Sequence, residues 1–239
     1  MAVPEALIEV KGIHAYYGAS HVLHGVDLVL HRGEAIGVMG RNGMGKTTLL
    51  RSMLGLLPPK EGQVKVRGVD MTRAAPHRIA RAGIAYVPEG RGIFADLSVR
   101  ENLVMAARRG VDGRREWTFE RVLSVFPRLG ERLNHGGQQL SGGEQQMLTV
   151  GRALMTNPDV LILDEATEGL APLVAREIWA ILRRLRDAGL SAIIVDKNFS
   201  CVSALTDHNI VLVKGRVVLE GTAPDLMRDP QALQRHLGI

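Results

Sequence analysis

Eight consecutive residues carry the clearest chemical signal in this chain. They match the pattern G-x-x-x-x-G-K-[ST], in which glycines let successive backbone N–H groups point toward an anion. In this pattern Lys46 reaches the β- and γ-phosphates of a nucleotide, and the Thr47 hydroxyl binds Mg²⁺. The eight residues of this loop, together with the residue that follows it, are Gly40, Arg41, Asn42, Gly43, Met44, Gly45, Lys46, Thr47 and Thr48.

The flanks of this loop support a phosphate-binding role over a glycine-rich turn that happens to contain a lysine. Residues 35–39 form a short apolar run that is typical of a buried strand. Residues 48–54 have the composition of the first turns of a helix. A strand, a glycine loop and a helix in this order place the positive end of the helix dipole at the bound phosphate. We therefore predict a nucleotide-phosphate site at residues 40–48.

A second candidate segment follows the apolar run 160–163. Asp164 at the tip of such a strand is expected to be a second anchor for Mg²⁺. Glu165 follows it directly and is expected to face the γ-phosphate, where a carboxylate can orient and polarise the attacking water. The alternative is a charged turn after a core strand, and the phosphate-binding loop disfavours it.

A third segment, residues 140–146, opens a helix with a serine and two glycines. Ser141 is a good N-cap, and Gly142 and Gly143 leave backbone N–H groups free to face an anion. Alone, this segment would be an ordinary helix cap. Together with the first loop, it suggests that one nucleotide is held between two protein molecules.

Composition sets the class of protein that must position these segments. The chain has 239 residues, 46% hydrophobic and 23% charged, which is typical of a globular protein with a substantial core. No apolar run approaches the roughly 18–20 residues that span a bilayer, and the N-terminus lacks the features of a signal peptide. The single cysteine excludes an internal disulfide, and we expect a reducing, cytoplasmic compartment. The net charge of +5 comes partly from arginine clusters, which are compatible with solvated helix faces, anionic lipid headgroups or nucleic acid. No aromatic residues interleave with them, which disfavours single-stranded nucleic acid, and no nucleic-acid partner is expected.

The pattern along the chain predicts an α/β fold. Strand-like runs fill the first third, helical patterns fill about residues 98–155, and short apolar strands alternate with helices in the last third. Ser98 and Glu101 have the spacing of a capping box, and a further helix is predicted over residues 116–126. Predicted strands and the hairpin cover residues 7–10, 22–30, 63–67, 84–87, 159–163, 191–195 and 210–219, and the longer helices cover 143–155 and 172–186.

The three segments together resemble the ATP-binding subunit of an ABC transporter, over about residues 7–239. Residues 140–146 match the signature sequence of that family. The resemblance implies an ATPase core with a mixed sheet flanked by helices, an inserted helical lobe and an N-terminal antiparallel β portion. The core would comprise residues 1–88 and 156–239, and the lobe about 89–155. It also implies a head-to-tail dimer in which ATP lies between the phosphate loop of one subunit and Ser141 to Gly143 of the other.

Three further positions follow from the resemblance. Tyr17 is expected to stack on the adenine ring, although a tyrosine here could also be a core residue, and Tyr16 is the second candidate. Glu89 replaces the usual glutamine of a loop that faces Mg²⁺ and the attacking water. Lys197 stands where the family places a histidine that contacts the γ-phosphate; it can donate to phosphate but does not change charge near pH 7. The implied catalytic set is therefore Glu165, Lys46, Glu89 and Lys197, and the implied metal ligands are Thr47, Glu89 and Asp164.

Within the family, residues 87–94 and 164–172 resemble the smaller ATPase of branched-chain amino acid importers. The resemblance implies a second ATPase subunit, with a heterodimer expected and a homodimer in isolation as the alternative. It also implies two membrane permeases, a periplasmic solute-binding protein acting indirectly, and a peripheral position on the cytoplasmic face of the inner membrane. Alternatives are an importer of urea, amides or other amino acids, and a non-transport ABC ATPase acting on DNA or ribosomes. A regulatory nucleotide-binding module is disfavoured because Glu165 is present.

Overall fold

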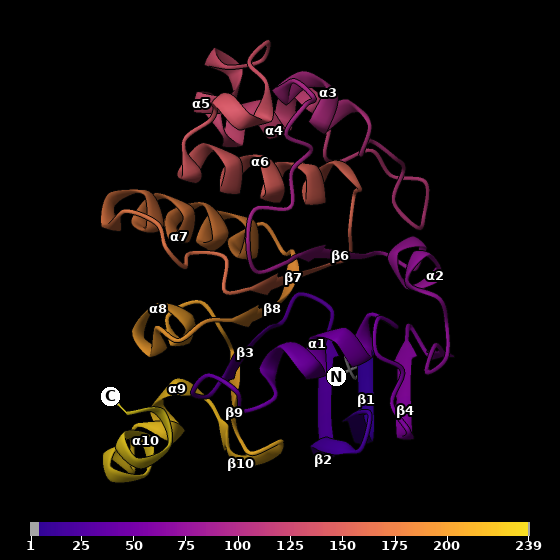
Figure 1. Ribbon diagram of the computed structural model, residues 1–239, viewed down its shortest axis with the longest axis vertical. Helices are drawn as coiled ribbons and strands as arrows, with labels where there is room; N and C mark the ends of the chain where they lie inside the picture. The colour runs from indigo at the N-terminus through magenta and orange to yellow at the C-terminus, as the bar shows by residue number, and fades with distance from the viewer. Residues whose placement is uncertain (1–4, 239) are drawn as a thin grey trace.

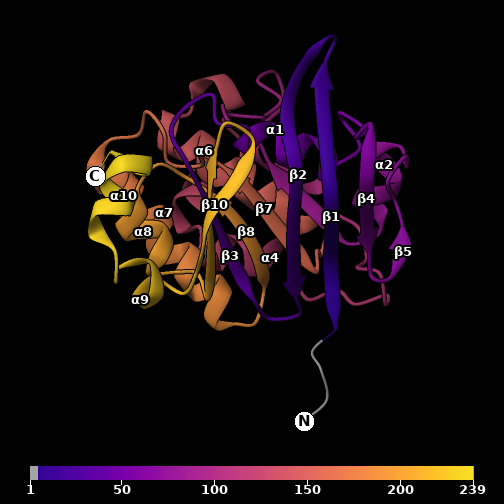
Figure 2. The same cartoon turned by 90° about the horizontal axis from the view of Figure 1, so that it is seen from below.

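The computed structural model describes residues 5–238 of the chain. Its helices and strands form three regions along the long axis (Figure 1). A group of helices lies at one end, a six-stranded sheet crosses the middle, and a four-stranded sheet lies at the other end, beside helix α1 (Figures 1 and 2).

The central sheet has the strand order β10-β9-β3-β8-β7-β6. The strands from β9 to β6 are parallel, and β10 pairs antiparallel with β9 through a hairpin. The bounds of these strands are β3 Ala35–Met39, β6 Ile84–Val87, β7 Val160–Asp164, β8 Ser191–Val195, β9 His208–Val213 and β10 Arg216–Gly221. Because β3, β7 and β8 are neighbours and parallel, the loops that follow them meet at one edge of the sheet.

The second sheet is antiparallel, with the order β2-β1-β4-β5. Its strands are β1 Ala6–Tyr17, β2 Ser20–His31, β4 Glu61–Val66 and β5 Val69–Asp70. Figure 2 shows this sheet face-on, with α1 behind it. The mixed central sheet and the N-terminal antiparallel sheet confirm the predicted fold class.

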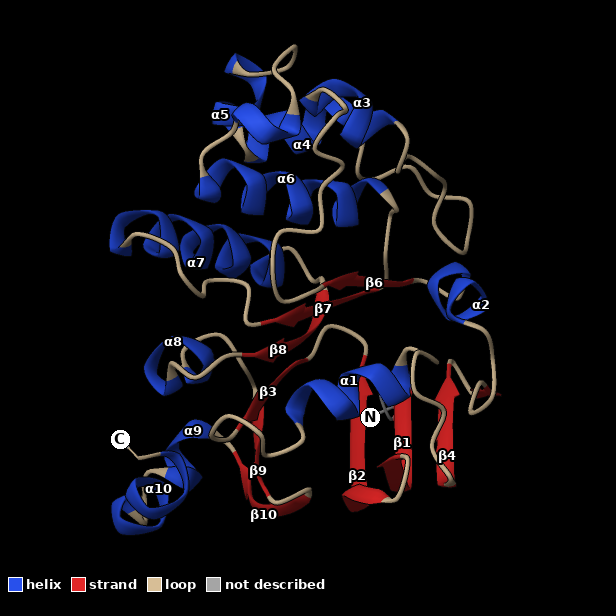
Figure 3. Cartoon of the chain, in the orientation of Figure 1, coloured by secondary structure: helices blue, strands red, loops and turns tan. Residues whose placement is uncertain are grey.

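The helices form a group at one end of the molecule and also flank the central sheet (Figure 3). Helices α3 to α6 form the end that corresponds to the predicted lobe, and α7 lies between α6 and the sheet (Figure 1). The longer helices are α1 Lys46–Met53, α6 Gly142–Met155, α7 Pro172–Asp187 and α10 Pro230–Leu237. The shorter ones are α2 Pro76–Arg81, α3 Val99–Val104, α4 Phe119–Val125, α5 Pro127–Glu131, the 3-10 turn η1 Gly137–Gln139, α8 Phe199–Ser203 and α9 Ala223–Leu226.

Alternate residues of the buried strands supply two separate cores. In β8, Ala192 and Ile194 belong to the core shared with α6 and α7, whereas Ile193 and Val195 belong to the core shared with α1 and the antiparallel sheet. The same alternation runs along β3 and β7. Successive side chains of a strand point to opposite faces, so a continuous apolar run covers both faces of a parallel sheet.

Local signals predicted most of the strands and about half of the helices. Ser98 and Glu101 form the predicted capping box, with the Ser98 N–H donating to Glu101 Oε2 at 2.8 Å. The helix predicted over residues 116–126 begins later, at Phe119, because the Thr118 side chain caps it by accepting from the Arg121 N–H. Helices α2, α5, α8, α9 and α10 were not predicted. Within residues 5–238, no helix has both the length and the apolar character needed to cross a membrane.

Candidate functional site

The predicted phosphate loop connects β3 to the first residue of α1. Gly45 is the N-cap of α1 with a φ of 104°, a left-handed conformation that side chains rarely adopt. A Cβ atom there would also lie 2.9 Å from Leu23 Cδ2. The loop borders a cavity of about 380 Å³. The lining residues are Val22, Asn42, Gly43, Gly45, Lys46, Thr47, Thr48, Glu89, Glu165 and Glu168.

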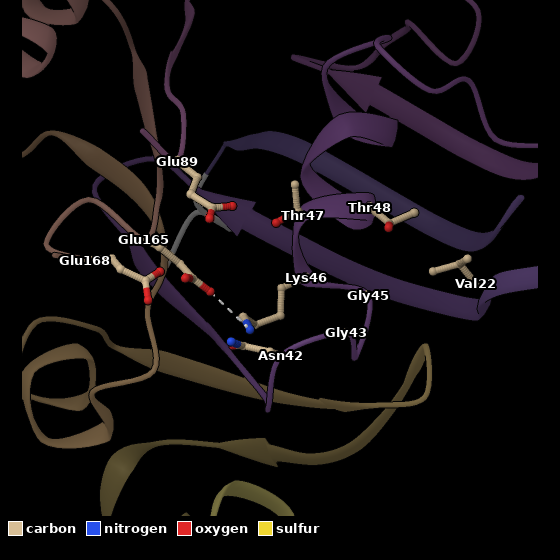
Figure 4. Close-up of a pocket in the computed structure, with 10 residues that line it drawn as sticks. All are labelled: Val22, Asn42, Gly43, Gly45, Lys46, Thr47, Thr48, Glu89, Glu165 and Glu168. Atoms are coloured by element: carbon tan, nitrogen blue, oxygen red, sulfur yellow. Dashed lines mark ion pairs between the residues drawn. The ribbon is translucent and has the colours of Figure 1, made fainter. Parts of the chain in front are cut away.

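Lys46 is a buried cation at the base of this cavity. Its ammonium donates to the carbonyl oxygens of Gly40, at 2.9 Å, and Arg41, at 3.3 Å, and lies 3.3 Å from Glu165 Oε1 (Figure 4). Its side chain is only 4% exposed. A desolvated ammonium on the first turn of a helix is well placed to attract phosphate, because Coulomb attraction strengthens where water is excluded.

Thr47 and Asp164 form an oxygen-rich pair beside Lys46. The Thr47 hydroxyl donates to Asp164 Oδ1 at 3.4 Å, and the Tyr86 hydroxyl donates to Asp164 Oδ2 at 3.2 Å. Asp164 is fully buried, and burial raises its pKa, while the hydrogen bonds from Thr47 and Tyr86 oppose that rise. Mg²⁺ prefers oxygen ligands, so Thr47 and Asp164, with the Glu89 carboxylate on the opposite wall, fit the chemistry of a nucleotide-bound Mg²⁺.

Glu165 has a strained backbone at the end of β7. Its φ is 48°, in the left-handed region that is uncommon for residues other than glycine, and its N–H donates to Val195 O of β8 at 2.8 Å. Such strain persists where surrounding contacts impose it and is frequent at functional sites. Burial, followed by a hydrogen bond shared with Glu168, raises the pKa of Glu165 to about 7, and the Lys46 ammonium opposes this rise.

Three carboxylates converge on this cavity. Carboxylate oxygens of Glu89, Glu165 and Glu168 all lie within 4.8 Å of one another, and Figure 4 shows Glu165 and Glu168 side by side. Sequence patterns singled out Glu89 and Glu165 but missed Glu168, three residues after Glu165. Glutamate after a strand is common at a protein surface, so residue type alone could not distinguish Glu168 from a solvated side chain.

Lys197 lies at the rim of the site and is paired with Glu168. Its ammonium is 2.8 Å from Glu168 Oε1, and its side chain is 62% exposed. The hydrogen bond with Glu168 raises the pKa of Lys197, which keeps the ammonium charged. The structure thus brings Lys197 to the loop that carries Glu165, but Lys197 itself does not line the cavity.

Tyr17 and the segment from Ser141 to Gly143 also lie outside the cavity lining, as do Gly40, Arg41 and Met44 of the phosphate loop. Tyr17, at the end of β1, is 44% exposed, and its hydroxyl accepts from Arg51 Nη1 of α1 at 3.2 Å. Ser141 caps α6 in the predicted manner, with its N–H donating to Glu144 Oε2 at 2.8 Å. Helix α6 and helix α1 lie on opposite sides of the central sheet (Figure 1), and Ser141, Gly142 and Gly143 do not belong to the cavity lining. A signature segment that lies apart from its own phosphate loop is consistent with a role at another subunit's site.

A second cleft, of about 320 Å³, lies where the loop after β6 meets α6. Pro88, Gly92 and Arg152 belong to its lining. Phe94, on the same loop, is 46% exposed, and the Arg152 guanidinium lies over its ring at 4.5 Å from the centroid. Phe94 is therefore a half-exposed aromatic residue at the junction of the sheet and the helical end.

Comparison with known proteins agrees with this geometry. Residues 23–168 match the family model described as ABC transporter. The chain is 37% identical to the high-affinity branched-chain amino acid transport ATP-binding protein BraG of Pseudomonas aeruginosa, over 95% of this chain and 97% of that protein. It is 31% identical to the lipopolysaccharide export system ATP-binding protein LptB of Escherichia coli, over 98% of each chain. Among solved structures, the ADP conformation of MJ1267, an ATP-binding cassette of an ABC transporter, superposes with a TM-score of 0.80 at 25% identity, covering 94% of each chain.

Proposed function

This chain belongs to the ABC transporter family of ATP-hydrolysing subunits, and on that premise we propose that it energises the uptake of branched-chain amino acids. The observation that carries the catalytic part of the proposal is one cavity. Lys46, Thr47 and Glu165 all line it, and Asp164 lies within hydrogen-bond reach of Thr47. Phosphate loop, metal ligands and candidate base therefore meet at the edge of the sheet where the parallel strands end.

We assign the following roles to these residues. Lys46 and the N–H groups at the start of α1 bind the β- and γ-phosphates of ATP. Thr47, Asp164 and Glu89 would hold Mg²⁺, which when bound would supply positive charge that neutralises the phosphates. Glu165 orients the attacking water and accepts its proton, a step that requires the ionised carboxylate.

The remaining site residues complete the nucleotide site from further away. Tyr17 provides an aromatic face for adenine at the end of β1, beside Arg51 of α1. Ser141, Gly142 and Gly143 form part of the site of a second ATPase subunit in a head-to-tail dimer. This arrangement is supported by the position of α6 and α1 on opposite sides of the central sheet, and by the absence of Ser141, Gly142 and Gly143 from the lining of the cavity (Figure 1). Division into an ATPase core and a lobe over residues 89–155 is part of the same proposal.

The working complex in this proposal contains a second ATPase subunit, two membrane permeases and, indirectly, a periplasmic solute-binding protein. This chain would then be a peripheral protein on the cytoplasmic face of the inner membrane. The cleft beside Phe94 is the surface that we assign to a permease segment, because it is lined both by Pro88, which precedes the cavity residue Glu89, and by Arg152 of α6.

Support for the amino acid substrate comes from the similarity to BraG, a branched-chain amino acid transport ATP-binding protein, and from the segments 87–94 and 164–172. The similarity to LptB, which covers as much of the chain, supports lipopolysaccharide export as a second candidate. The discriminating experiment is uptake of labelled leucine, isoleucine and valine by cells that lack the gene for this chain. We expect the wild-type chain to restore uptake and Glu165→Gln to fail. Unimpaired amino acid uptake in the deleted strain would exclude this substrate, and an envelope defect would instead favour export of lipopolysaccharide.

A further inference from the structure

Two parallel side-chain bridges join the loop after β7 to the loop after β8. The Thr167 hydroxyl donates to Asp196 Oδ2 at 2.9 Å, and the Lys197 ammonium lies 2.8 Å from Glu168 Oε1. Asp196 is itself buried and accepts from the Asn198 N–H, so the bridge that it makes is anchored. The hydrogen bond between Thr167 and Asp196 therefore fixes the distance between the two loops. The ion pair between Glu168 and Lys197 forms at the adjacent position of the same two loops.

Glu168 also faces Glu165 inside the cavity. Both residues line it, and their carboxylate oxygens lie within 4.8 Å of each other. On the far side of Glu165 is Lys46, at 3.3 Å. The order across the cavity is thus ammonium, carboxylate, carboxylate, ammonium, with Lys46 and Lys197 at the two ends.

In this order, the charge of Lys197 compensates the charge that Glu168 brings to the cavity. Without Lys197, the Glu168 carboxylate would add an uncompensated negative charge to a cavity that must accept the phosphates of ATP. Like charges a few ångströms apart repel each other, and the repulsion is stronger near a protein surface than in bulk water because the effective dielectric constant is lower. An ammonium bound to Glu168 removes this repulsion and also fixes the carboxylate beside Glu165.

We propose that Glu168 is a positioning residue for Glu165, and that Lys197 acts on the ATP site by holding and neutralising Glu168. The inference rests on the proposed ATPase site and adds a residue to it. In this proposal Lys197 does not contact the γ-phosphate directly, and it influences the ATP site through its ion pair with Glu168. The first consequence is that ATP binding depends on Lys197 only while residue 168 carries a negative charge. The second consequence is that the loss of Glu168 lowers the rate of ATP hydrolysis more than the affinity for ATP.

A double-mutant cycle on the full-length chain tests the first consequence. Binding of ATP in the presence of Mg²⁺ is measured by calorimetry for the wild type, Lys197→Ala, Glu168→Gln and the double variant. We expect Lys197→Ala to weaken ATP binding by about tenfold, and the double variant to return to within about threefold of the wild type, because the repelling charge is gone. Lys197→Arg, which preserves the ion pair, should bind ATP like the wild type.

A matched control comes from another exposed ion pair. Asp225 of α9 and Arg228, just after that helix, are 3.3 Å apart, and neither lines the cavity. Arg228→Ala removes a cation as Lys197→Ala does, and we expect it to leave ATP binding unchanged. A loss of binding in this control equal to that in Lys197→Ala would mean that net charge, and not the Glu168 pair, is responsible, which would overturn the inference.

Turnover tests the second consequence. We expect Glu168→Gln to lower kcat for ATP hydrolysis by about tenfold or more without weakening ATP binding, since Glu165 loses its neighbour while the phosphate loop is intact. A double variant that binds ATP as weakly as Lys197→Ala would show that Lys197 contacts the nucleotide directly. Normal kcat in Glu168→Gln would remove its positioning role. Failure of the wild-type chain to bind ATP would instead contradict the proposed function, so the two failures are distinguishable.

Discussion

Lys46 and Glu165 form an ion pair in which Nζ lies 3.3 Å from Oε1, and both side chains are largely buried. The pair joins the cation of the phosphate loop to the candidate base at the end of β7 (Figure 4). The two side chains stabilise each other electrostatically: the ammonium stabilises the ionised carboxylate, and the carboxylate compensates a buried positive charge. Changes at either position should separate binding from turnover.

Lys46→Ala should weaken ATP binding while the fold is retained. A charged hydrogen bond to phosphate contributes about 1.5–3 kcal/mol, so we expect affinity to fall by at least about tenfold. Calorimetry measures the affinity, and circular dichroism checks the fold. Lys11→Ala, an exposed lysine on β1, serves as the control and should bind ATP normally. Undiminished affinity in a folded Lys46→Ala chain would contradict the assignment of the phosphate loop.

Glu165→Gln should bind ATP and fail to hydrolyse it. The amide preserves the shape of the side chain but cannot accept a proton, and the loss of a general base typically lowers kcat by about 10²–10⁴-fold. Hydrolysis is followed by phosphate release, and binding by calorimetry. Glu220→Gln on the exposed face of β10 is the control. Hydrolysis at the wild-type rate by Glu165→Gln would require another base.

The raised pKa of Glu165 should make the stability of the chain depend on pH. The folded chain holds this proton up to about pH 7, whereas the ordinary value for a glutamate is 4.5. Folding therefore takes up a proton between these values, and the contribution of Glu165 to stability is full below about pH 4.5 and is lost as pH rises through about 7. Glu165→Gln lacks this loss, so its free energy of unfolding should exceed that of the wild type by about 1 kcal/mol at pH 8, a figure reduced for solvent screening, and should approach it toward pH 5. Urea unfolding at pH 5 and pH 8 measures the free energy of unfolding of both proteins. A difference between them that is the same at the two pH values would refute the raised pKa of Glu165.

Asp159, outside the nucleotide site, should contribute substantially to the free energy of unfolding. Its carboxylate accepts from Arg32 at 3.2 Å, Arg67 at 2.8 Å and Arg114 at 3.0 Å, and its side chain is only 4% exposed. Asp159→Asn leaves three arginines without this partner, and we expect a loss of about 1–3 kcal/mol in the free energy of unfolding. Asp112→Asn removes an exposed partner of Arg114 and should cost less than about 1 kcal/mol. Equal losses in the two variants would argue against a buried charge cluster.

Phe94→Ala should impair assembly or transport more than nucleotide binding. The ring is 46% exposed beside the cleft assigned to a permease, and half-exposed aromatic side chains often contribute much of the binding energy of an interface. We expect a loss of at least about 2 kcal/mol in complex formation, seen as reduced co-purification with the permeases, and unchanged ATP binding by the isolated chain. Leu56→Ala, another exposed apolar residue at 53%, is the control for general surface effects. Normal uptake in cells with a stable Phe94→Ala subunit would refute the assignment.

Features encoded by neighbouring residues were predictable from the sequence. The loop at residues 40–47, the Ser98–Glu101 capping box and the Ser141 cap depend on residue types only a few positions apart. Hydrogen bonds within one turn and buried runs of a strand leave a local pattern, so their positions can be inferred without knowing the fold. The segments that form the nucleotide cavity were therefore identifiable before their arrangement was known.

Contacts between distant loops were decided by the tertiary structure. Nothing local marks Glu168 as a partner of Lys197, or Asp159 as the shared partner of three arginines. Glu168 meets Lys197 because β7 and β8 are adjacent and parallel, so the loops after them emerge at the same edge of the sheet. Strand order is set by how the apolar faces pack, and charged side chains are then brought together as a consequence. The sequence alone determined which residues could bind and hydrolyse ATP, and the packing of the sheet determined which charges stand beside them.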